Sequence, residues 1–540
     1  MSSRQLVQGV AGAAALIAVL TVLARLAGFG RTLVFTNTVG ADTTGGTYLA
    51  ANNVPNIVFE VVAGGALASL VVPMLAGGIA TGDRDQVRRT ASALLGWTLL
   101  VLTPLAVLIA LFAEPIARLL LGEGDPDKVA LAARFLLVFA PQVVLYGIGI
   151  VLTGVLQAHR RFASPALAPL LSSVVVASTY LLFAWMGGAR DAEDLTTPAE
   201  LVLGVGTTLG VVALTLCLLA PMRGLRLGLR PSLRFPVGAA PRVRRLAVAG
   251  VLTLAGQQLV AAVAIRLAND GAPDHAQVVY AAGLTLFLVP WAALAVPLAT
   301  SAYPGLAERA EEGDEEGFTR SLAPVTVLVV VASALAAAVL VAVAGPMARV
   351  FLAAGPDAAV ASLRDTTIAF APGLVGYGLV AVLTRALYAR GLWKAPTVCV
   401  VGGWLIAVVA DLVLAAALPS AERALALGAG HSLGVTVAGV ALLVVVARTA
   451  GAPALRGLPQ AGGAALLGAV LGGAAGWWIS RALGADPVPD DVLAAVGTGI
   501  PAAAAALVVG LAVMMGAARA PLATAWRELR SSGRQEVHGG

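Results

Sequence analysis

Long runs of apolar residues alternate along the chain with short stretches that hold most of its charged residues. Many of the apolar runs reach the roughly 20 residues with which an α-helix crosses the hydrocarbon of a bilayer. This pattern predicts about fourteen membrane-spanning helices separated by loops. Their expected positions are residues 6–29, 47–79, 91–113, 131–157, 163–187, 198–221, 243–268, 277–304, 322–345, 366–388, 395–418, 424–447, 461–481 and 491–517.

Composition agrees with this pattern. Of the 540 residues, 59% are hydrophobic and 12% are charged, whereas a soluble globular domain carries roughly 25% charged residues. We therefore predict an all-α polytopic membrane protein. No small-residue cleavage site precedes Arg25, so the first apolar segment is expected to be retained as a helix. The two cysteines lie inside apolar runs and give no indication of a disulfide.

The distribution of positive charge predicts the orientation of the chain. An even number of spans places both termini on one side of the membrane. If that side is the cytoplasm, most of the 35 lysines and arginines fall in cytoplasmic segments, as the positive-inside rule requires. We expect a multi-pass protein of the bacterial inner membrane with cytoplasmic N- and C-termini. The basic loops are interpreted as contacts with anionic membrane lipids, and nucleic acid is not an expected partner.

An internal repeat relates the two halves of the chain. Segment 140–171 aligns without gaps on segment 371–402, at an offset of 231 residues, and Pro141 pairs with Pro372. The same offset relates Tyr146 to Tyr377, Pro115 to Pro346, Arg118 to Arg349, Pro73 to Pro304, and the loop residues Gly82, Asp83 and Arg89 to Gly313, Asp314 and Arg320. Prolines in one register are difficult to attribute to shared composition, so we interpret the pattern as a duplication.

The duplicated unit holds six predicted helices, an even number, so both copies should cross the membrane in the same direction, as in transporters with parallel repeats. The substrate of such a transporter is expected between the lobes. We predict an N-terminal six-helix lobe at 1–221, a cytoplasmic Arg/Pro-rich linker at 222–242, a C-terminal six-helix lobe at 243–447, two extra helices at 461–517 and a cytoplasmic tail at 518–540. Prolines within spans, among them Pro141, Pro290, Pro297 and Pro372, are predicted bending points.

Charged residues inside spans are candidate functional groups, because a charge in hydrocarbon costs about 2.5 kcal/mol or more. Arg25 and Arg31 flank two glycines in the first span, where their guanidinium groups could bind a phosphate bidentately. The alternative is that Arg31 extends to the lipid headgroups while Arg25 pairs with Glu60 of the second span.

Three further charges lie within or near spans of the second half. Arg266 and Arg385 could add positive charge to a substrate cavity, or could pack structurally. Asp411 is expected to bind a cation, to pair with an arginine such as Arg385, or to be protonated. Glu60 and Asp411 are thus candidates for ion coupling or for charge pairing.

The sequence shows no arrangement typical of a catalytic or metal site. His159, His275 and His431 are expected at span ends or in loops, and His538 lies in the tail. No acid, base or nucleophile cluster recurs with them. We therefore expect neither an enzyme nor a resident cofactor, with a monovalent cation at the acidic residues as the one alternative.

Several motifs resemble the MurJ (MviN) family of lipid II flippases, which belongs to the multidrug/oligosaccharidyl-lipid/polysaccharide exporter superfamily. RLAGFGR at 25–31 resembles the family pattern R-x-x-G-F-x-R, and it is followed in family order by VGA at 39–41, VPN at 54–56 and GALASLVVP at 65–73. Segments 141–169 and 385–396 resemble the two loops of the family that re-enter each lobe. The resemblance extends over most of the chain, and the family's fourteen-helix layout agrees with the predicted spans.

The resemblance implies a flippase that moves lipid II, a disaccharide-pentapeptide on undecaprenyl pyrophosphate, from the inner to the outer leaflet by alternating access. In that comparison Arg25 and Arg31 match the two functional arginines of the family's first helix. Several expected charges are replaced here: Thr32, Gly46, Phe59, Glu60, Gly64, Val263, Ala282 and Gly283 occupy positions where the family carries acidic or basic residues.

Three functions follow as hypotheses. The first is a flippase for a lipid-linked precursor in peptidoglycan biosynthesis, with Arg25, Arg31, Arg266 and Arg385 as substrate-binding residues. The second is a cation-coupled drug or metabolite antiporter of the same superfamily. The third is a scaffold that does not transport and instead binds other cell-wall synthesis or division proteins.

Overall fold

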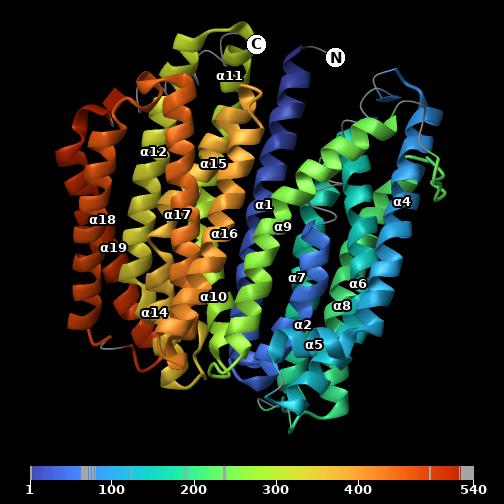
Figure 1. The fold of residues 1–540 in the computed structure, drawn as a ribbon, viewed down its shortest axis with the longest axis horizontal. Coiled ribbons are helices and arrows are strands. Elements are labelled where there is room, and N and C mark those ends of the chain that lie inside the picture. Colours follow the sequence, from blue (N-terminus) through green and yellow to red (C-terminus); the bar gives the residue numbers. More distant parts are fainter. Residues whose placement is uncertain are drawn as a thin grey trace. The chain divides into compact units, whose positions relative to one another are not determined.

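The computed structural model describes residues 3–61, 71, 74–75, 78–79, 81–122, 124–188, 191, 193–234, 239–485, 488–521 and 523–524, without the side chains of 3–18, 21 and 239–253. Within these ranges every regular element is helical (Figure 1). The predicted all-α class is confirmed. Parts of the predicted span 47–79, of the linker 222–242 and of the tail 518–540 lie outside the described residues, as does Gly64.

The chain divides into two compact units, Met1–Asp270 and Gly271–Gly540. The helices of the first unit are α1 (Ser3–Thr38), α2 (Thr43–Phe59), α4 (Arg84–Leu111), α5 (Ala113–Leu121), α6 (Pro126–Ala158), α7 (Ala163–Trp185), α8 (Thr197–Arg223) and α9 (Ala239–Asn269). By its contacts α9 belongs to this unit, where it packs against α2 and α5. The lobe and linker boundaries expected from the sequence stay a prediction.

The second unit carries the remaining helices. They are α10 (Ala276–Pro290), the π-turn η2 (Trp291–Ala295), α11 (Val296–Glu312), α12 (Glu315–Ala342), α13 (Ala344–Phe351), α14 (Asp357–Phe370), α15 (Gly373–Ala389), α16 (Lys394–Ala417), η3 (Ser420–Glu422), α17 (Arg423–Ala450), η4 (Ala452–Leu455), α18 (Leu458–Ala482) and α19 (Val492–Ala517).

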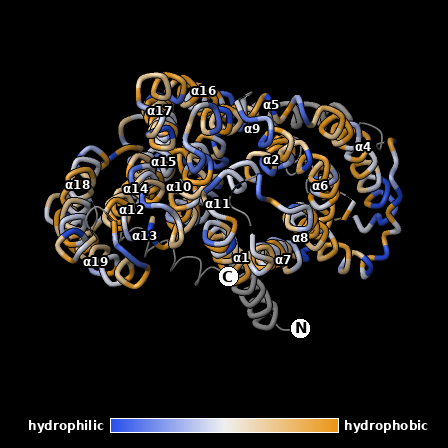
Figure 2. Tube along the Cα trace, turned by 90° about the horizontal axis from the view of Figure 1, so that it is seen from below, coloured by the Kyte–Doolittle hydropathy of each residue, from blue (hydrophilic) through white to orange (hydrophobic). Residues whose placement is uncertain are grey.

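Among the described residues, ten helices are long and apolar enough to cross a membrane, and the bent pair α14–α15 makes up to eleven. The predicted spans 6–29 and 243–268 are helical as parts of α1 and α9, although neither belongs to the ten. The chain is therefore a multi-span helical protein, and the count of fourteen stays a prediction. Hydrophobic residues predominate along the helices (Figure 2).

Each unit is held together by helix packing. In the first unit α1 packs on α7, and α6 packs on α2, α4 and α8. In the second unit α17 packs on α14, α15 and α16, while α12 contacts α15, α18 and α19. Close approach in the second unit depends on glycine: a Cβ at Gly472 of α18 would lie 2.6 Å from the carbonyl oxygen of Ala506 in α19. Small residues of this kind let helices in a membrane pack backbone to backbone.

The helix bounds follow the repeat predicted from the sequence. Both ends of α4 and α12 differ by 231 residues, as do the first residues of α5 and α13, of α6 and α14, and of α7 and α16. The caps are duplicated too: Asp83 Oδ1 accepts the N–H of Gln86 at 2.8 Å, and Asp314 Oδ1 accepts the N–H of Gly317 at 2.8 Å. The duplication inferred from the residues is thus also seen in the positions at which these helices begin.

The copies differ at the repeated proline. Pro141 lies inside α6, which continues through it, whereas Pro372 separates α14 from α15 at a bend of 45°. The residue after the proline also differs. Gln142 in the first copy donates to Thr208 Oγ1 at 2.9 Å, while a Cβ at Gly373 in the second would lie 2.9 Å from the Cα of Ser432. A bend at Pro372 is confirmed. A second irregularity occurs at Pro290, where the π-turn η2 follows α10.

A left-handed turn ends the repeated helix in both copies. It is occupied by Gly391 in the second copy, with φ of 73°, and by Arg160 in the first, with φ of 58°. Glycine adopts this conformation freely because it has no Cβ, whereas other L-residues are strained in it. The first unit therefore carries a strained residue where the second has none.

Replacing Arg160 by glycine should stabilise the protein. The left-handed conformation costs a residue other than glycine roughly 1–2 kcal/mol, part of which is offset by the greater freedom of glycine in the unfolded chain. We expect the free energy of unfolding of Arg160→Gly to rise by about 0.5–1 kcal/mol, measured by thermal unfolding in detergent. Gly391→Ala is the reciprocal variant and should lower stability; the same sign of change in both variants would contradict the strain argument.

Candidate functional site

Arg31 lies in α1 beside a cluster of aromatic and hydroxyl side chains in the first unit. It is half-buried, and its charge acts on the hydroxyl groups of Tyr48, Tyr146 and Tyr180. It forms no ion pair with any acidic residue in the described parts of the chain. An unpaired guanidinium next to hydroxyl groups keeps its five N–H donors available for an anion.

The hydroxyl groups near Arg31 belong to a buried network. The hydroxyl of Tyr48 lies 3.0 Å from that of Tyr180 and 2.7 Å from Oγ1 of Thr207, which in turn donates to the Leu203 carbonyl at 2.7 Å. Phe35, one helical turn after Arg31, packs on both tyrosine rings, at centroid distances of 5.6 Å and 5.2 Å. The network holds α1 against α2, α7 and α8. It therefore fixes the position of the α1 backbone at Arg31.

Arg25 is exposed, and so is Glu60, which follows the last residue of α2. The alternative in which these two residues pair is wrong for the structure: neither forms an ion pair with any described residue. The reason is that α1 packs chiefly on α7. The stretch between Arg25 and Arg31 stays helical, and a Cβ at Gly28 or Gly30 would meet open space.

Arg266 is paired within its own helix. Near the end of α9 its Nη1 lies 2.6 Å from Oδ2 of Asp270, four residues later, and both side chains are partly exposed. The pair lies against the turn at Gly122, where a Cβ would be 3.1 Å from Asp270 Oδ1. Its positive charge is therefore largely compensated, in contrast to that of Arg31.

Arg385 and Asp411 are not paired, so that alternative is also wrong. Arg385 Nη1 donates to the carbonyl of Ala381 in its own helix at 2.7 Å. Arg385 lies near the end of α15, and Asp411 lies far along α16, about 25 Å from Lys394 at 1.5 Å per residue. Since α16 follows α15 after a short turn, the two residues lie at different depths.

Asp411 is fully buried, and neither carboxyl oxygen has a hydrogen-bond partner. The backbone of α17 abuts it closely, because a Cβ at Gly430 would collide with Oδ1 of Asp411. Tyr280 of α10 is within electrostatic reach of the carboxyl group. A buried carboxylate without partners is costly, so the neutral, protonated form of this side chain is favoured unless a counter-charge is present.

His431 was expected at a span end, and that expectation is wrong. It lies in the third turn of α17, is 7% exposed, and neither ring nitrogen has a hydrogen-bond partner. Its ring contacts those of Phe287, Phe370 and Trp404 at centroid distances of 5.5, 5.4 and 5.4 Å. The first turns of α17 pack against α10 and α14, which buries the ring. His431 is therefore a second buried polar side chain without a hydrogen-bond partner, after Asp411. It lies next to Gly430, whose backbone packs against Asp411.

Sequence reasoning missed the tyrosine network and the position of His431. Tyr146 was noticed only as a repeat match, and Tyr48 and Tyr180 are isolated aromatic residues in apolar runs. Their proximity is a property of helix packing. No group of three or more His, Cys, Asp or Glu side chains suited to a metal ion occurs in the parts of the chain that the structure describes.

Comparison with known proteins gives one family. The family model described as lipid II flippase MurJ matches residues 35–485. The lipid II flippase MurJ of Burkholderia cenocepacia is 25% identical over 432 residues, which are 76% of this chain and 80% of that protein. A MurJ homologue of Rhizobium tropici is 26% identical over 230 residues, and the match spans only 41% of its length.

Solved structures show the same fold. A structure of lipid II flippase MurJ in an inward closed conformation superposes with a TM-score of 0.71 at 17% identity, covering 93% of this chain and 98% of that one. An inward-facing multidrug resistance transporter of the MATE family and MOP superfamily gives 0.65 at 14% identity, covering 82% and 98%.

Substituting Asp411 by asparagine should stabilise the protein when no coupling cation is present. The substitution keeps the shape of the side chain and, at a pH high enough to ionise the carboxyl group, removes a buried charge without a partner, so we expect a gain of about 1–3 kcal/mol in unfolding free energy under that condition. Thermal unfolding in sodium-free buffer measures it. The control is Asp357→Asn, which removes the partner of the buried Arg349 at 2.5 Å and should be destabilising. A loss of stability in Asp411→Asn would mean that the carboxylate has a favourable partner.

Proposed function

This chain belongs to the lipid II flippase MurJ family, and on that premise we propose that it moves a polyprenyl-pyrophosphate-linked cell-wall precursor, lipid II, across a bacterial membrane. Movement from the inner to the outer leaflet by alternating access would supply peptidoglycan synthesis. The observation that carries the proposal beyond the family match is Arg31, a half-buried guanidinium in α1 with no described acidic partner.

The substrate chemistry suits such a group. A pyrophosphate presents planar sets of oxygens with negative charge, and arginine binds them through two parallel hydrogen bonds. We propose Arg31 as the main pyrophosphate contact, with the exposed Arg25, six residues earlier in α1, as the second. Arg385, half-buried and bonded only to its own backbone, is a further substrate-binding candidate. Arg266 contributes less because Asp270 compensates its charge.

Cytoplasmic N- and C-termini are part of the same proposal. They follow from the charge of the loops and place the basic segment after α8 at the inner leaflet. Protein partners in cell-wall synthesis or division would then meet the chain at its cytoplasmic loops.

Loss of Arg31 should abolish most of the flippase activity. In a strain that depends on this gene, we expect Arg31→Ala, alone or with Arg25→Ala, to reduce lipid II cleavage by an externally added toxin and to let lipid II accumulate inside. Arg31→Lys should rescue partly, because lysine carries the charge without the bidentate geometry. Arg118→Ala, which removes an exposed arginine paired with Glu114, is the control and should behave as wild type.

Normal cleavage and growth with both arginines replaced would contradict the proposed contact. A protein that serves only as a scaffold would give that result, and it would fail instead when its cytoplasmic loops are altered.

One observation favours cation coupling, whether for a flippase or for a drug or metabolite antiporter. Asp411 offers two carboxyl oxygens that no described group satisfies. We propose that it binds a monovalent cation or a proton, and that Glu60 is a weaker candidate because it is exposed.

Cation binding at Asp411 should appear as selective stabilisation. We expect the thermal midpoint of the wild type to rise on adding NaCl but not choline chloride at equal ionic strength, because only sodium can satisfy the carboxyl oxygens. Asp411→Asn should lose this rise, and Glu60→Gln should keep it. Equal effects of both salts on the wild type, together with transport that ignores Na⁺ and H⁺ gradients, would count against coupling.

A further inference from the structure

The segment that follows α8 does not leave the first unit but lies across α4. Residues 224–234, called the strap here, are held there by three hydrogen bonds. The N–H of Ser232 donates to the Ser92 carbonyl at 3.0 Å, and the N–H of Arg230 donates to Ser92 Oγ at 3.2 Å. The indole N–H of Trp97 donates to the carbonyl of Leu233 at 3.0 Å. The strap is therefore fixed to α4 at two residues, Ser92 and Trp97.

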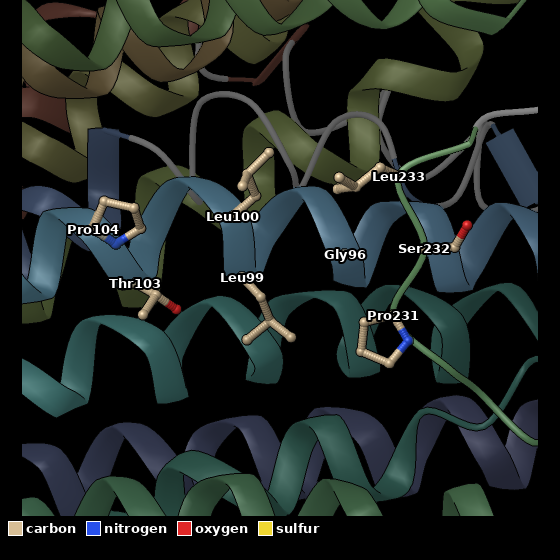
Figure 3. A pocket seen from close by; sticks show the side chains of 8 residues that line it. All are labelled: Gly96, Leu99, Leu100, Thr103, Pro104, Pro231, Ser232 and Leu233. Atoms are coloured by element: carbon tan, nitrogen blue, oxygen red, sulfur yellow. The ribbon is translucent and has the colours of Figure 1, made fainter.

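Gly96 makes this close crossing possible. A Cβ at this position would collide with the backbone of Ser232. Figure 3 shows the strap passing over α4 at Gly96, with Pro231 on one side of the crossing and Leu233 on the other. A side chain at residue 96 would push the strap off the helix.

The crossing leaves an apolar groove along α4. It has a volume of about 460 Å³ and is lined by Gly96, Leu99, Leu100, Thr103, Pro104, Pro231, Ser232 and Leu233. From Gly96 to Pro104 it extends about 12 Å along the helix axis. Its rim is exposed and apolar, with Leu100 at 47% and Leu233 at 52%. Since α4 is a membrane-spanning candidate whose outer residues are also apolar, the surrounding medium is lipid.

The strap carries positive charge at the polar end of this groove. Arg226, Arg230 and Arg234 of the strap are all exposed, as is Arg223 at the end of α8, and none of the four forms an ion pair within the described residues. The start of α4 adds Arg84, Arg88 and Arg89. Of these, Arg88 is compensated by Asp85 at 3.0 Å. Guanidinium groups at the level of the headgroups attract anionic phosphate, and each contributes measurably to lipid binding.

We propose that the strap and α4 form a binding site for an anionic phospholipid. Its phosphate contacts Arg230 and Arg234, and one acyl chain lies in the groove from Leu233 toward Pro104. The site is complementary to both parts of such a lipid. Its positive charge matches the phosphate, and its apolar groove, which extends into the hydrocarbon, matches the acyl chain. It rests neither on the proposed transport function nor on Arg31, because strap and groove lie wholly on α4 and the segment after α8.

The test uses the full chain in detergent micelles with phosphatidylglycerol or phosphatidylcholine as probes, and native mass spectrometry to measure the lipid bound. Wild type should bind phosphatidylglycerol preferentially. The double variant Arg230→Gln/Arg234→Gln should weaken that binding about 25-fold, since each arginine contributes about fivefold. Arg118→Gln/Arg320→Gln removes the same charge from exposed arginines elsewhere and should change binding less than twofold. Equal binding of both lipids, or an equal loss in the control, would overturn the proposal.

A second measurement locates the acyl chain without relying on a charge variant. Phosphatidylglycerol with a photoreactive diazirine in one chain should label the stretch 96–104 of wild type, and labelling should fall in Gly96→Leu, whose side chain displaces the strap and so removes one wall of the groove. Thermal unfolding and the size-exclusion profile check that this variant is folded. Labelling confined to other helices would contradict the site. The photoreactive lipid can also be displaced by unlabelled competitors. If undecaprenyl phosphate displaces it at a lower concentration than phosphatidylglycerol does, the groove binds a polyprenyl chain and the phospholipid proposal is rejected.

Discussion

Hydrocarbon provides no hydrogen-bond partner for the backbone, so each polar group in a membrane segment must be satisfied within the protein. The described chain meets this constraint with helices throughout, and many of its hydroxyl side chains follow the same rule. Thr98, Thr207 and Thr326 each donate to the carbonyl four residues earlier, at 2.7, 2.7 and 2.9 Å. Asp411 and His431 are among the exceptions: both are buried, and none of their side-chain polar atoms has a hydrogen-bond partner.

The same constraint explains how two copies of one unit can diverge without losing the fold. Four helix starts and the caps at Asp83 and Asp314 are preserved at a fixed offset, because the ends of spans must lie at the surfaces of the bilayer. Between the ends the copies are free to differ. The first keeps α6 continuous through Pro141, while the second bends at Pro372, where Gly373 allows the backbone to approach Ser432.

The helical class, the repeat and many helix positions could be predicted from the residues, because apolar periodicity and capping are local properties. The candidate site could be predicted only in part. Arg31 was identifiable as a charge in an apolar run, but its tyrosine neighbours come from three other helices. The predicted pairing of Asp411 with Arg385 is wrong, because the spacing of residues along the sequence does not show how deep each residue lies in the bilayer. The strap was expected as a surface linker, and its attachment to α4 depends on one glycine, Gly96, whose role no local pattern reveals.

At the turn that holds Arg160, the two copies share the backbone conformation and not the residue. Its backbone has the left-handed form that Gly391 shows in the other copy. A turn of this form arises readily on glycine and is adopted by arginine only at an energetic cost. The helices on either side of the turn therefore impose its shape on whichever residue occupies it.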